Sequence, residues 1–326
     1  MKFVTLDDGS RDGRLHIASR DGQRVVPADG ARTLLAALET WDDHLATWQA
    51  QYDRLNDGDA GAAPFALETA LAPLPRAWQW LDGSAFETHA LLLQKAWGQP
   101  QVGLSERPLM YQGMSDRFLP PQSVARFPSA ADGIDFEGEF GVILRDVPMG
   151  TPASLAARAI RLIVLINDWS LRALGPVEMA TGFGWLQCKP ACSMAPFAVT
   201  PDELGAAWHD ARVCLPLRID VNGQPFGRAN GGEMKFGFHE LIAHAAYSRD
   251  LPAGTILGSG TVANASYEDV GSSCIAERQA IELIAHGASR SPFLNSGDRV
   301  EMRASTADGV ELFGPIDQSV EISAST

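Results

Sequence analysis

The stretch at residues 133–144, GIDFEGEFGVIL, constrains the fold of this chain more than any other part of it. Apolar and acidic residues alternate along it, and successive side chains of a β-strand point to opposite faces, so the pattern predicts a strand. The apolar face comprises Ile134, Phe136, Phe140, Val142 and Leu144. The opposite face carries three acids, Asp135, Glu137 and Glu139. The fold must bury one side of this strand and accommodate three carboxylates on the other.

The three carboxylates have two interpretations. An acidic strand face can simply meet solvent, as is common in acidic proteins, and this chain has 40 Asp and Glu against 26 Lys and Arg. Carboxylates two residues apart on a strand, however, are separated by only about 7 Å, and they repel unless a cation bridges them or a pKa rises. Since the stretch contains no Lys or Arg, a hard cation such as Mg²⁺ or Ca²⁺ is the alternative partner.

The acidic excess excludes some classes of partner. A formal net charge of −14 gives no electrostatic footprint for nucleic acid or an anionic membrane surface. The longest aliphatic runs, such as residues 162–166, are far shorter than the roughly 20 residues of a membrane span. The sequence turns acidic at Asp7, before a signal-peptide core could form, and four scattered cysteines make no disulfide framework. We therefore expect a cytoplasmic protein.

The sequence pattern of residues 1–75 predicts a small separate domain. Short strands are expected at residues 3–6, 15–19 and 24–26, because Asp-Gly turn signals separate them. An apolar residue recurs every three or four positions over 34–55, which predicts an amphipathic helix. That helix packs on the neighbouring sheet or main domain, or it docks a partner. Residues 56–64 have the composition of a linker, so we predict an N-terminal domain at 1–75 and a larger domain at 76–326.

The larger domain is rich in predicted strands. The clearest candidates are residues 134–144, 162–166, 213–221, 300–303 and 310–316. Helices are predicted at 85–97, 154–160 and 238–248. Strands and helices do not alternate regularly, and neither GxGxxG nor GxxxxGK[ST] occurs, which argues against dinucleotide-binding and P-loop folds. The pattern predicts an α+β domain dominated by mixed sheet.

Two further segments carry candidate polar residues. Residues 161–166 predict a strand buried on both faces, and Asp168 just beyond it is either a cap for the next turn or a ligand in a cleft. Ser84 and Glu87 form a capping box, which predicts a helix from residue 85 with His89 in its second turn. His89 is either an ordinary core or surface histidine or a functional one whose partner comes from a distant segment.

The remaining candidates are weaker when taken singly. Lys189 lies among apolar and small residues, where a lysine can stabilise an oxyanion or carboxylate, although most lysines face solvent. Cys188 and Cys192 lack a second ligand pair for a soft metal. The small-residue runs at 258–261 and 271–277 allow close approach of the backbone to a ligand, or they are ordinary turns.

The order of these motifs resembles the fumarylacetoacetate hydrolase family over roughly residues 76–326. The pieces that carry the resemblance are Asp82 and His89, YQG at 111–113, ExE at 137–139, NDWSxR at 167–172, Lys189, GSGT at 258–261 and Gly271 to Glu277. The resemblance implies a mixed β-sandwich roll, a homodimer and a divalent metal in the cleft. Mg²⁺ is the first expectation, with Ca²⁺ or Mn²⁺ as alternatives.

The family pattern also assigns roles residue by residue. It implies metal ligands at Asp82, Glu137, Glu139 and Asp168. It implies a catalytic His89 oriented by Glu277, with Lys189 and Arg172 stabilising negative charge, and substrate contacts from Tyr111 and Thr261. The acid that often follows the arginine of NDWSAR is replaced by Ala173, and a substrate-binding arginine after the histidine has no clear match. The identity of the substrate therefore stays open.

The function implied by the resemblance is hydrolysis of a C–C bond in a 1,3-diketo or acylpyruvate-type acid, a reaction found in aromatic catabolism. His89 would deprotonate a water, and the metal would stabilise the enolate that leaves. Decarboxylation of a 2-oxo acid, hydration or isomerisation on the same metal platform is the nearest alternative. A metal-binding β-protein without catalytic activity is the alternative from another class.

Overall fold

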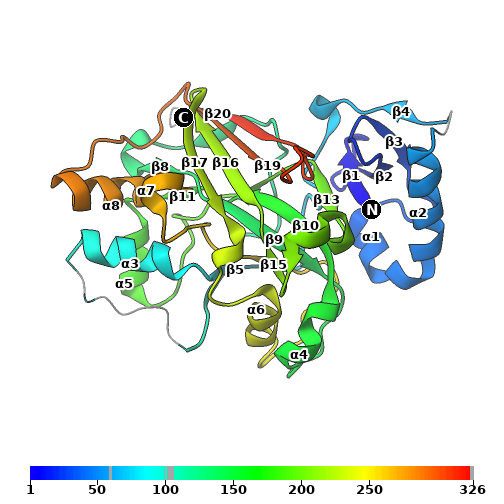
Figure 1. The fold of residues 1–326 in the computed structure, drawn as a ribbon, viewed down its shortest axis with the longest axis horizontal. Helices are drawn as coiled ribbons and strands as arrows, with labels where there is room; N and C mark the ends of the chain where they lie inside the picture. The colour runs from blue at the N-terminus through cyan, green and yellow to red at the C-terminus, as the bar shows by residue number, and fades with distance from the viewer. Residues whose placement is uncertain (59–60, 99, 101–105, 324–326) are drawn as a thin grey trace.

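A mixed sheet of eleven strands forms the spine of the computed structural model, which describes residues 1–58, 61–98, 100 and 106–323 (Figure 1). Its strands run in the order β4-β3-β2-β1-β13-β10-β9-β18-β5-β6, with β12 paired to β10. They are β1 (Lys2–Leu6), β2 (Arg14–Ala18), β3 (Arg24–Pro27), β4 (Ala63–Pro64), β5 (Trp80–Ser84), β6 (Leu109–Gly113), β9 (Gly138–Leu144), β10 (Ile160–Asn167), β12 (Ser193–Met194), β13 (Phe197–Val199) and β18 (Ile256–Gly258). β18 is parallel to β5 and antiparallel to β9, so the sheet is mixed as expected.

A second sheet covers part of the first. Its order is β17-β16-β19-β20-β7, built from β7 (Ala125–Phe127), β16 (Pro216–Val221), β17 (Gln224–Asn230), β19 (Arg299–Ala304) and β20 (Ile316–Ile322). Two small pairs join β8 (Ile134–Asp135) to β11 (Ser170–Leu171) and β14 (Trp208–His209) to β15 (Arg212–Val213).

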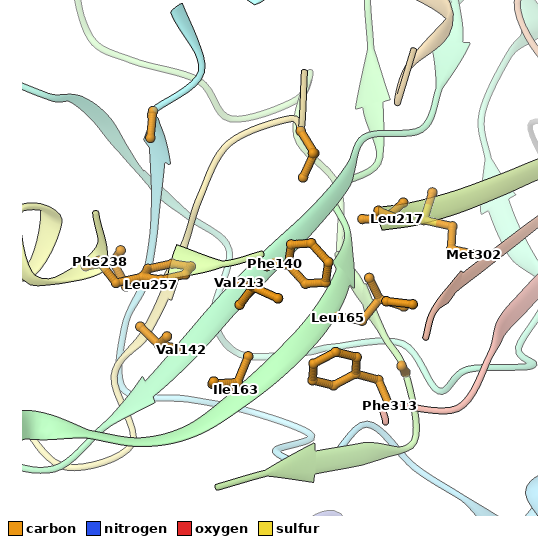
Figure 2. Packing of buried hydrophobic residues seen from close by; sticks show 14 of the residues in the cluster. Phe140, Val142, Ile163, Leu165, Val213, Leu217, Phe238, Leu257, Met302 and Phe313 are labelled. Atoms are coloured by element: carbon orange, nitrogen blue, oxygen red, sulfur yellow. The ribbon is translucent and has the colours of Figure 1, made fainter. Parts of the chain in front are cut away.

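The main core fills the space between these sheets. Figure 2 shows Phe140 and Leu165 of the eleven-stranded sheet close to Leu217 and Met302 of the five-stranded sheet, and all four belong to one buried cluster. Apolar side chains that alternate along β9 and β10 supply one wall of this core. The predicted α+β fold with a mixed β-sandwich roll is therefore confirmed.

Helices lie at the two ends of the molecule and over the sheets. They are α1 (Leu34–Glu39), α2 (Trp41–Asn56), α3 (Glu87–Ala96), α4 (Ala153–Ala156), α5 (Gly175–Thr181), α6 (Phe238–Ala245), α7 (Tyr267–Val270) and α8 (Ile275–His286). Short 3₁₀ turns occupy Leu67–Thr69, Ala130–Asp132, Ala157–Ala159, Pro201–Ala207 and Gly231–Glu233. α3 and α8 contact each other at the end of the molecule away from α1 and α2 (Figure 1). Among the described helices, none combines the length and the apolar character needed to cross a bilayer.

The N-terminal strands follow the prediction within a residue at each end, and they extend the main sheet because β1 pairs with β13. The helix predicted at 34–55 is two helices that meet at Thr40. Its apolar stripe packs on this part of the sheet, with Trp41 and Trp48 buried against Phe3. The division of the chain at residue 75 stays a prediction, and the linker predicted at 56–64 includes residues 59 and 60, which lie outside the described part.

Four predictions about elements were wrong. The strand predicted at 134–144 breaks into β8 and β9, and all three of its acids are buried, so its acidic face does not meet solvent. Helix α3 begins at Glu87, because Ser84 stays in β5 and the Glu87 carboxylate binds the Lys235 ammonium (2.7 Å) instead of closing a capping box. The segment at 310–316 is no strand, since β20 only begins at Ile316. Helix α8 begins at Ile275, inside the small-residue run 271–277, and no helix was predicted there.

Candidate active site

Three buried carboxylates converge across four neighbouring strands of the main sheet, β10, β9, β18 and β5. Asp82 is on β5, Glu139 is on β9, and Asp168 follows directly after β10. The strand register explains the convergence. Gly258 of β18 pairs with Asp82 on one side and with β9 on the other, and Glu139 of β9 pairs with Ile166, two residues before Asp168. One oxygen from each carboxylate lies within 4.8 Å of the others. Segments up to 86 residues apart in sequence thus meet at one point.

Gly258 makes this convergence possible. A Cβ atom at this position would collide with the Asp82 carboxylate and come within 3.0 Å of Glu139 Oε2. The glycine in the GSGT run therefore leaves the room that the acids occupy, which favours the interpretation of close approach over that of an ordinary turn.

The electrostatics of this cluster fit a divalent cation. Burial and the neighbouring Asp168 raise the pKa of Asp82 well above its usual range, and burial with Asp82 and Asp168 does the same to the pKa of Glu139. Neither carboxylate oxygen of Glu139 has a hydrogen-bond donor among the described residues. A proton shared with Asp82 is one way to relieve the repulsion. A hard cation is the other, and three buried carboxylates form a ligand set that suits it.

We expect the metal-free protein to lose stability as the pH rises. The pKa values of Asp82 and Glu139 are raised in the folded state above their ordinary values of 3.8 and 4.5. Between the ordinary and the raised pKa values, the folded state therefore binds protons that the unfolded state has released. The free energy of unfolding falls over this range of pH. Thermal melting of chelator-treated protein should therefore show a falling midpoint from about pH 5 to about pH 8.

Added Mn²⁺ should raise that midpoint more at the higher pH, because it binds the ionised carboxylates. The Asp82→Asn variant is the control, since removing one of the repelling charges should flatten the pH dependence. A midpoint that stays constant with pH in the wild type would contradict the prediction.

Glu137 lies outside the group of three carboxylates and is neutralised by two cations. The Lys189 ammonium is 2.6 Å from Glu137 Oε2, and the Arg172 Nη2 atom is 2.6 Å from Glu137 Oε1. Although burial opposes it, these two charges hold the pKa of Glu137 below its usual range. The proposed fourth ligand is therefore an ion-pair partner in this structure, and its role as a ligand stays a prediction.

The Lys189 ammonium has three acceptors at hydrogen-bond distance. It donates to Glu137 Oε2 (2.6 Å), Asp168 Oδ2 (2.7 Å) and Ser170 Oγ (2.8 Å). Burial alone would lower the pKa of Lys189, but Asp168 and Glu137 raise it above its usual range, so the side chain stays charged. A buried, charged lysine beside the acid cluster agrees with the expected role in charge stabilisation. To contact a substrate, however, it must release one of these acceptors.

The two residues expected to contact substrate also lie at the cluster. The Tyr111 hydroxyl donates to Asp168 Oδ2 (2.7 Å), and its ring packs edge-on against Trp185 at a centroid distance of 4.9 Å. Thr261 is buried next to Gly260, whose N–H donates to Asp82 Oδ1 (3.2 Å). Tyr111 therefore contacts the cluster directly, whereas Thr261 follows a residue that does, and their contacts to substrate stay a prediction.

His89 and Glu277 form a hydrogen-bonded pair between two helices. His89 lies in the first turn of α3 and Glu277 in the first turn of α8, and His89 Nδ1 is 3.1 Å from Glu277 Oε2. The Glu277 side chain is fully buried, whereas 14% of the His89 side chain is exposed. A carboxylate on Nδ1 fixes the tautomer that leaves Nε2 free to accept a proton. The distant partner required for a functional His89 is thus present.

Several residues at the site were not predicted. The Cys192 thiol lies 3.0 Å from Asp168 Oδ1, and Ser170 and Trp185 contact Lys189. Asp135, placed by the strand pattern on a shared face with Glu137, pairs with Arg172, as Glu137 does. No spacing rule marks these residues. The signal that could have found Cys192 and Ser170 is their proximity in sequence to Lys189 and Asp168.

Comparison with known proteins identifies both parts of the chain. The family model described as "Fumarylacetoacetate (FAA) hydrolase C-terminal" matches residues 79–321, and the one described as "Fumarylacetoacetase N-terminal domain 2" matches residues 1–76. A 2,4-didehydro-3-deoxy-L-rhamnonate hydrolase of Sphingomonas sp. (strain SKA58) is 24% identical over 182 residues, which cover 55% of this chain and 59% of that protein. The match thus spans less than two thirds of that relative.

Solved structures share the fold along nearly the whole chain. A maleylpyruvate hydrolase from Sphingobium sp. SYK-6, in complex with manganese(II) ion and pyruvate, superposes with a TM-score of 0.66 at 14% identity, covering 99% of each chain. A 5-carboxymethyl-2-hydroxymuconate delta-isomerase from Mycobacterium smegmatis gives 0.63 at 18% identity, covering both chains completely. At these identities the likeness establishes the fold.

Proposed function

The chain belongs to the fumarylacetoacetate hydrolase family, and from this membership we propose that it is a metal-dependent hydrolase of acylpyruvate-type 1,3-diketo acids. The observation that carries the choice of hydrolysis is the His89–Glu277 pair, because His89 acts electrostatically on Glu137, which shares the Lys189 ammonium with Asp168 of the carboxylate cluster. A base with a fixed tautomer next to a cation site is what activation of water requires. Decarboxylation or isomerisation would need no such water, and these two reactions, together with hydration, form the second candidate.

Asp82, Glu139 and Asp168, joined by Glu137 when it leaves its ion pairs, would hold the divalent ion. When bound, the ion supplies Lewis acidity that polarises the substrate carbonyl and offsets the negative charge formed during cleavage. We expect Mg²⁺, with Mn²⁺ or Ca²⁺ as alternatives, and a homodimer. Manganese in the maleylpyruvate hydrolase structure supports a divalent ion of this kind.

The residues of this chain then perform the proton transfers. His89 Nε2 accepts a proton from water while its Nδ1–H stays hydrogen-bonded to Glu277. The water oxygen bonds to the distal carbonyl carbon, and Lys189 with Arg172 stabilises the oxyanion. The C–C bond breaks, its electron pair forms the enolate of a pyruvate-type acid, and His89 returns the proton to carbon. The products are pyruvate and a carboxylic acid.

We expect purified protein to cleave acetylpyruvate only with a divalent ion. Loss of the ultraviolet absorbance of the diketo acid should accompany equimolar pyruvate and acetate, and H₂¹⁸O should label the acetate carboxyl group. EDTA should abolish the reaction, and excess Mg²⁺ or Mn²⁺ should restore it.

Oxaloacetate and a diketo sugar acid, assayed in parallel, separate the candidates. Release of CO₂ from oxaloacetate without cleavage of either diketo acid would reject the hydrolase in favour of a decarboxylase. Turnover that is fully insensitive to EDTA would reject the role of the metal.

A further inference from the structure

Asp135 is a buried carboxylate that none of the steps above uses, yet it connects two parts of the site. It is fully buried on β8, and four donors surround it. Its Oδ1 accepts from the backbone N–H groups of Phe136 (2.8 Å) and Ile275 (2.7 Å). Its Oδ2 accepts from the N–H of Ala276 (3.0 Å) and from Arg172 Nε (2.7 Å).

Two of these bonds fix the beginning of α8. Ile275 and Ala276 are the first two residues of that helix, where N–H groups have no partner within the helix and attract negative charge. Glu277 is the next residue, and its own N–H bonds the Cys274 sulfur (3.3 Å). Asp135 therefore holds the turn that aims Glu277 at His89.

The fourth bond fixes the direction of Arg172. Asp135 holds the guanidinium at Nε, and Nη2, on the same edge, then lies 2.6 Å from Glu137. Because a guanidinium is planar and rigid, anchoring Nε determines where Nη2 points. One carboxylate thus orients a member of the proton-transfer pair and a cation proposed to stabilise the oxyanion.

We propose that Asp135 is a positioning residue that couples the His89–Glu277 pair to Arg172. This inference rests on the proposed function for its kinetic consequence, but the anchoring itself can be measured without catalysis. The Asp135→Asn variant is the sharpest probe. Its amide oxygen can keep the two Oδ1 bonds, but its NH₂ group would face the donors of Ala276 and Arg172.

With acetylpyruvate and saturating Mn²⁺, we expect Asp135→Asn to lower kcat by about 10–100-fold, since small misplacements of reacting groups cost up to this much. KM and the Kd for Mn²⁺ should stay within about two-fold, because Asp135 bonds none of Asp82, Glu139 or Asp168. The loss in kcat should shrink when Glu277→Gln or Arg172→Gln is already present, as groups that act together are not additive. An undiminished loss in either background overturns the proposal as stated.

Glu203→Gln is the matched control. The Glu203 side chain is also buried and pairs with the N-terminal ammonium (2.9 Å) and the Tyr52 hydroxyl (2.9 Å), outside the site. This variant should lower the melting temperature but leave kcat within about two-fold, which separates loss of a buried ion pair from loss of positioning. A fall in kcat equal to that of Asp135→Asn would count against the proposal.

Hydrogen–deuterium exchange tests the anchor if acetylpyruvate is not a substrate. The amide of Ala276 should exchange at least about ten-fold faster in Asp135→Asn, while amides late in α8 keep their protection. Unchanged exchange at Ala276 would overturn the anchoring role. Failure of the wild type to cleave acetylpyruvate, with the exchange result as expected, would instead count against the proposed function alone.

Discussion

Replacing His89 by alanine should lower kcat for acylpyruvate cleavage by about 10²–10⁴-fold, the usual contribution of a general base. The expectation follows from the 3.1 Å contact between His89 Nδ1 and Glu277 Oε2, which leaves Nε2 as the proton acceptor. The His89 side chain is only 14% exposed and bonds the fully buried Glu277, so the variant should also lose some stability. Steady-state kinetics measures the loss in kcat, and thermal melting measures the loss in stability.

The control for this variant is His16→Gln. His16 lies on β2. Among the described residues, its imidazole ring hydrogen-bonds only the Arg14 carbonyl, away from the site, so kcat should be unchanged. Combining His89→Ala with Glu277→Gln should cost no more than His89→Ala alone, because the glutamate acts through the histidine. Full activity of His89→Ala on a confirmed substrate would remove the histidine from the mechanism and favour a reaction without activated water.

The acid cluster could be predicted from sequence for a physical reason. Charges are rarely buried without a partner, so Glu139 inside a strand and Asp168 at the end of a strand buried on both faces made a site one interpretation, beside a solvated strand face and a turn cap. The resemblance to a family then added Asp82, His89 and Glu277. Local signals sufficed where each charge stood next to an apolar run, because the run itself placed the charge inside the protein.

The parts that could not be predicted depend on contacts between distant segments. The capping box at Ser84 failed because antiparallel pairing with Leu109 of β6 holds Ser84 in β5, and this pairing outweighs a cap worth about 1 kcal/mol. The first turn of α8 is held by Asp135, which is 140 residues away. The fate of Glu137 was equally hidden, because its two cations come from residues 172 and 189.

Replacing Lys189 should affect metal binding and catalysis in opposite directions, because its ammonium and a divalent ion would compete for the same carboxylate oxygens. We expect Lys189→Met to lower kcat by about 10²–10³-fold through loss of a charge-stabilising donor. Without metal it should also destabilise the protein by about 3–5 kcal/mol, since Glu137 and Asp168 lose a buried counter-charge. Urea unfolding with and without Mn²⁺ measures this cost.

Mn²⁺ should recover more stability in Lys189→Met than in the wild type, and its Kd should fall, because the ion no longer competes with an ammonium at Asp168 Oδ2. Lys2→Met is the matched control. Lys2 is also buried, but it donates to the carbonyl oxygens of Arg20 (2.9 Å) and Glu311 (3.2 Å), and burial lowers its pKa to about 8. Its replacement should leave both kcat and the affinity for Mn²⁺ unchanged. Weaker binding of Mn²⁺ by Lys189→Met would instead mean that the lysine supports the metal site by holding Glu137 and Asp168 in place.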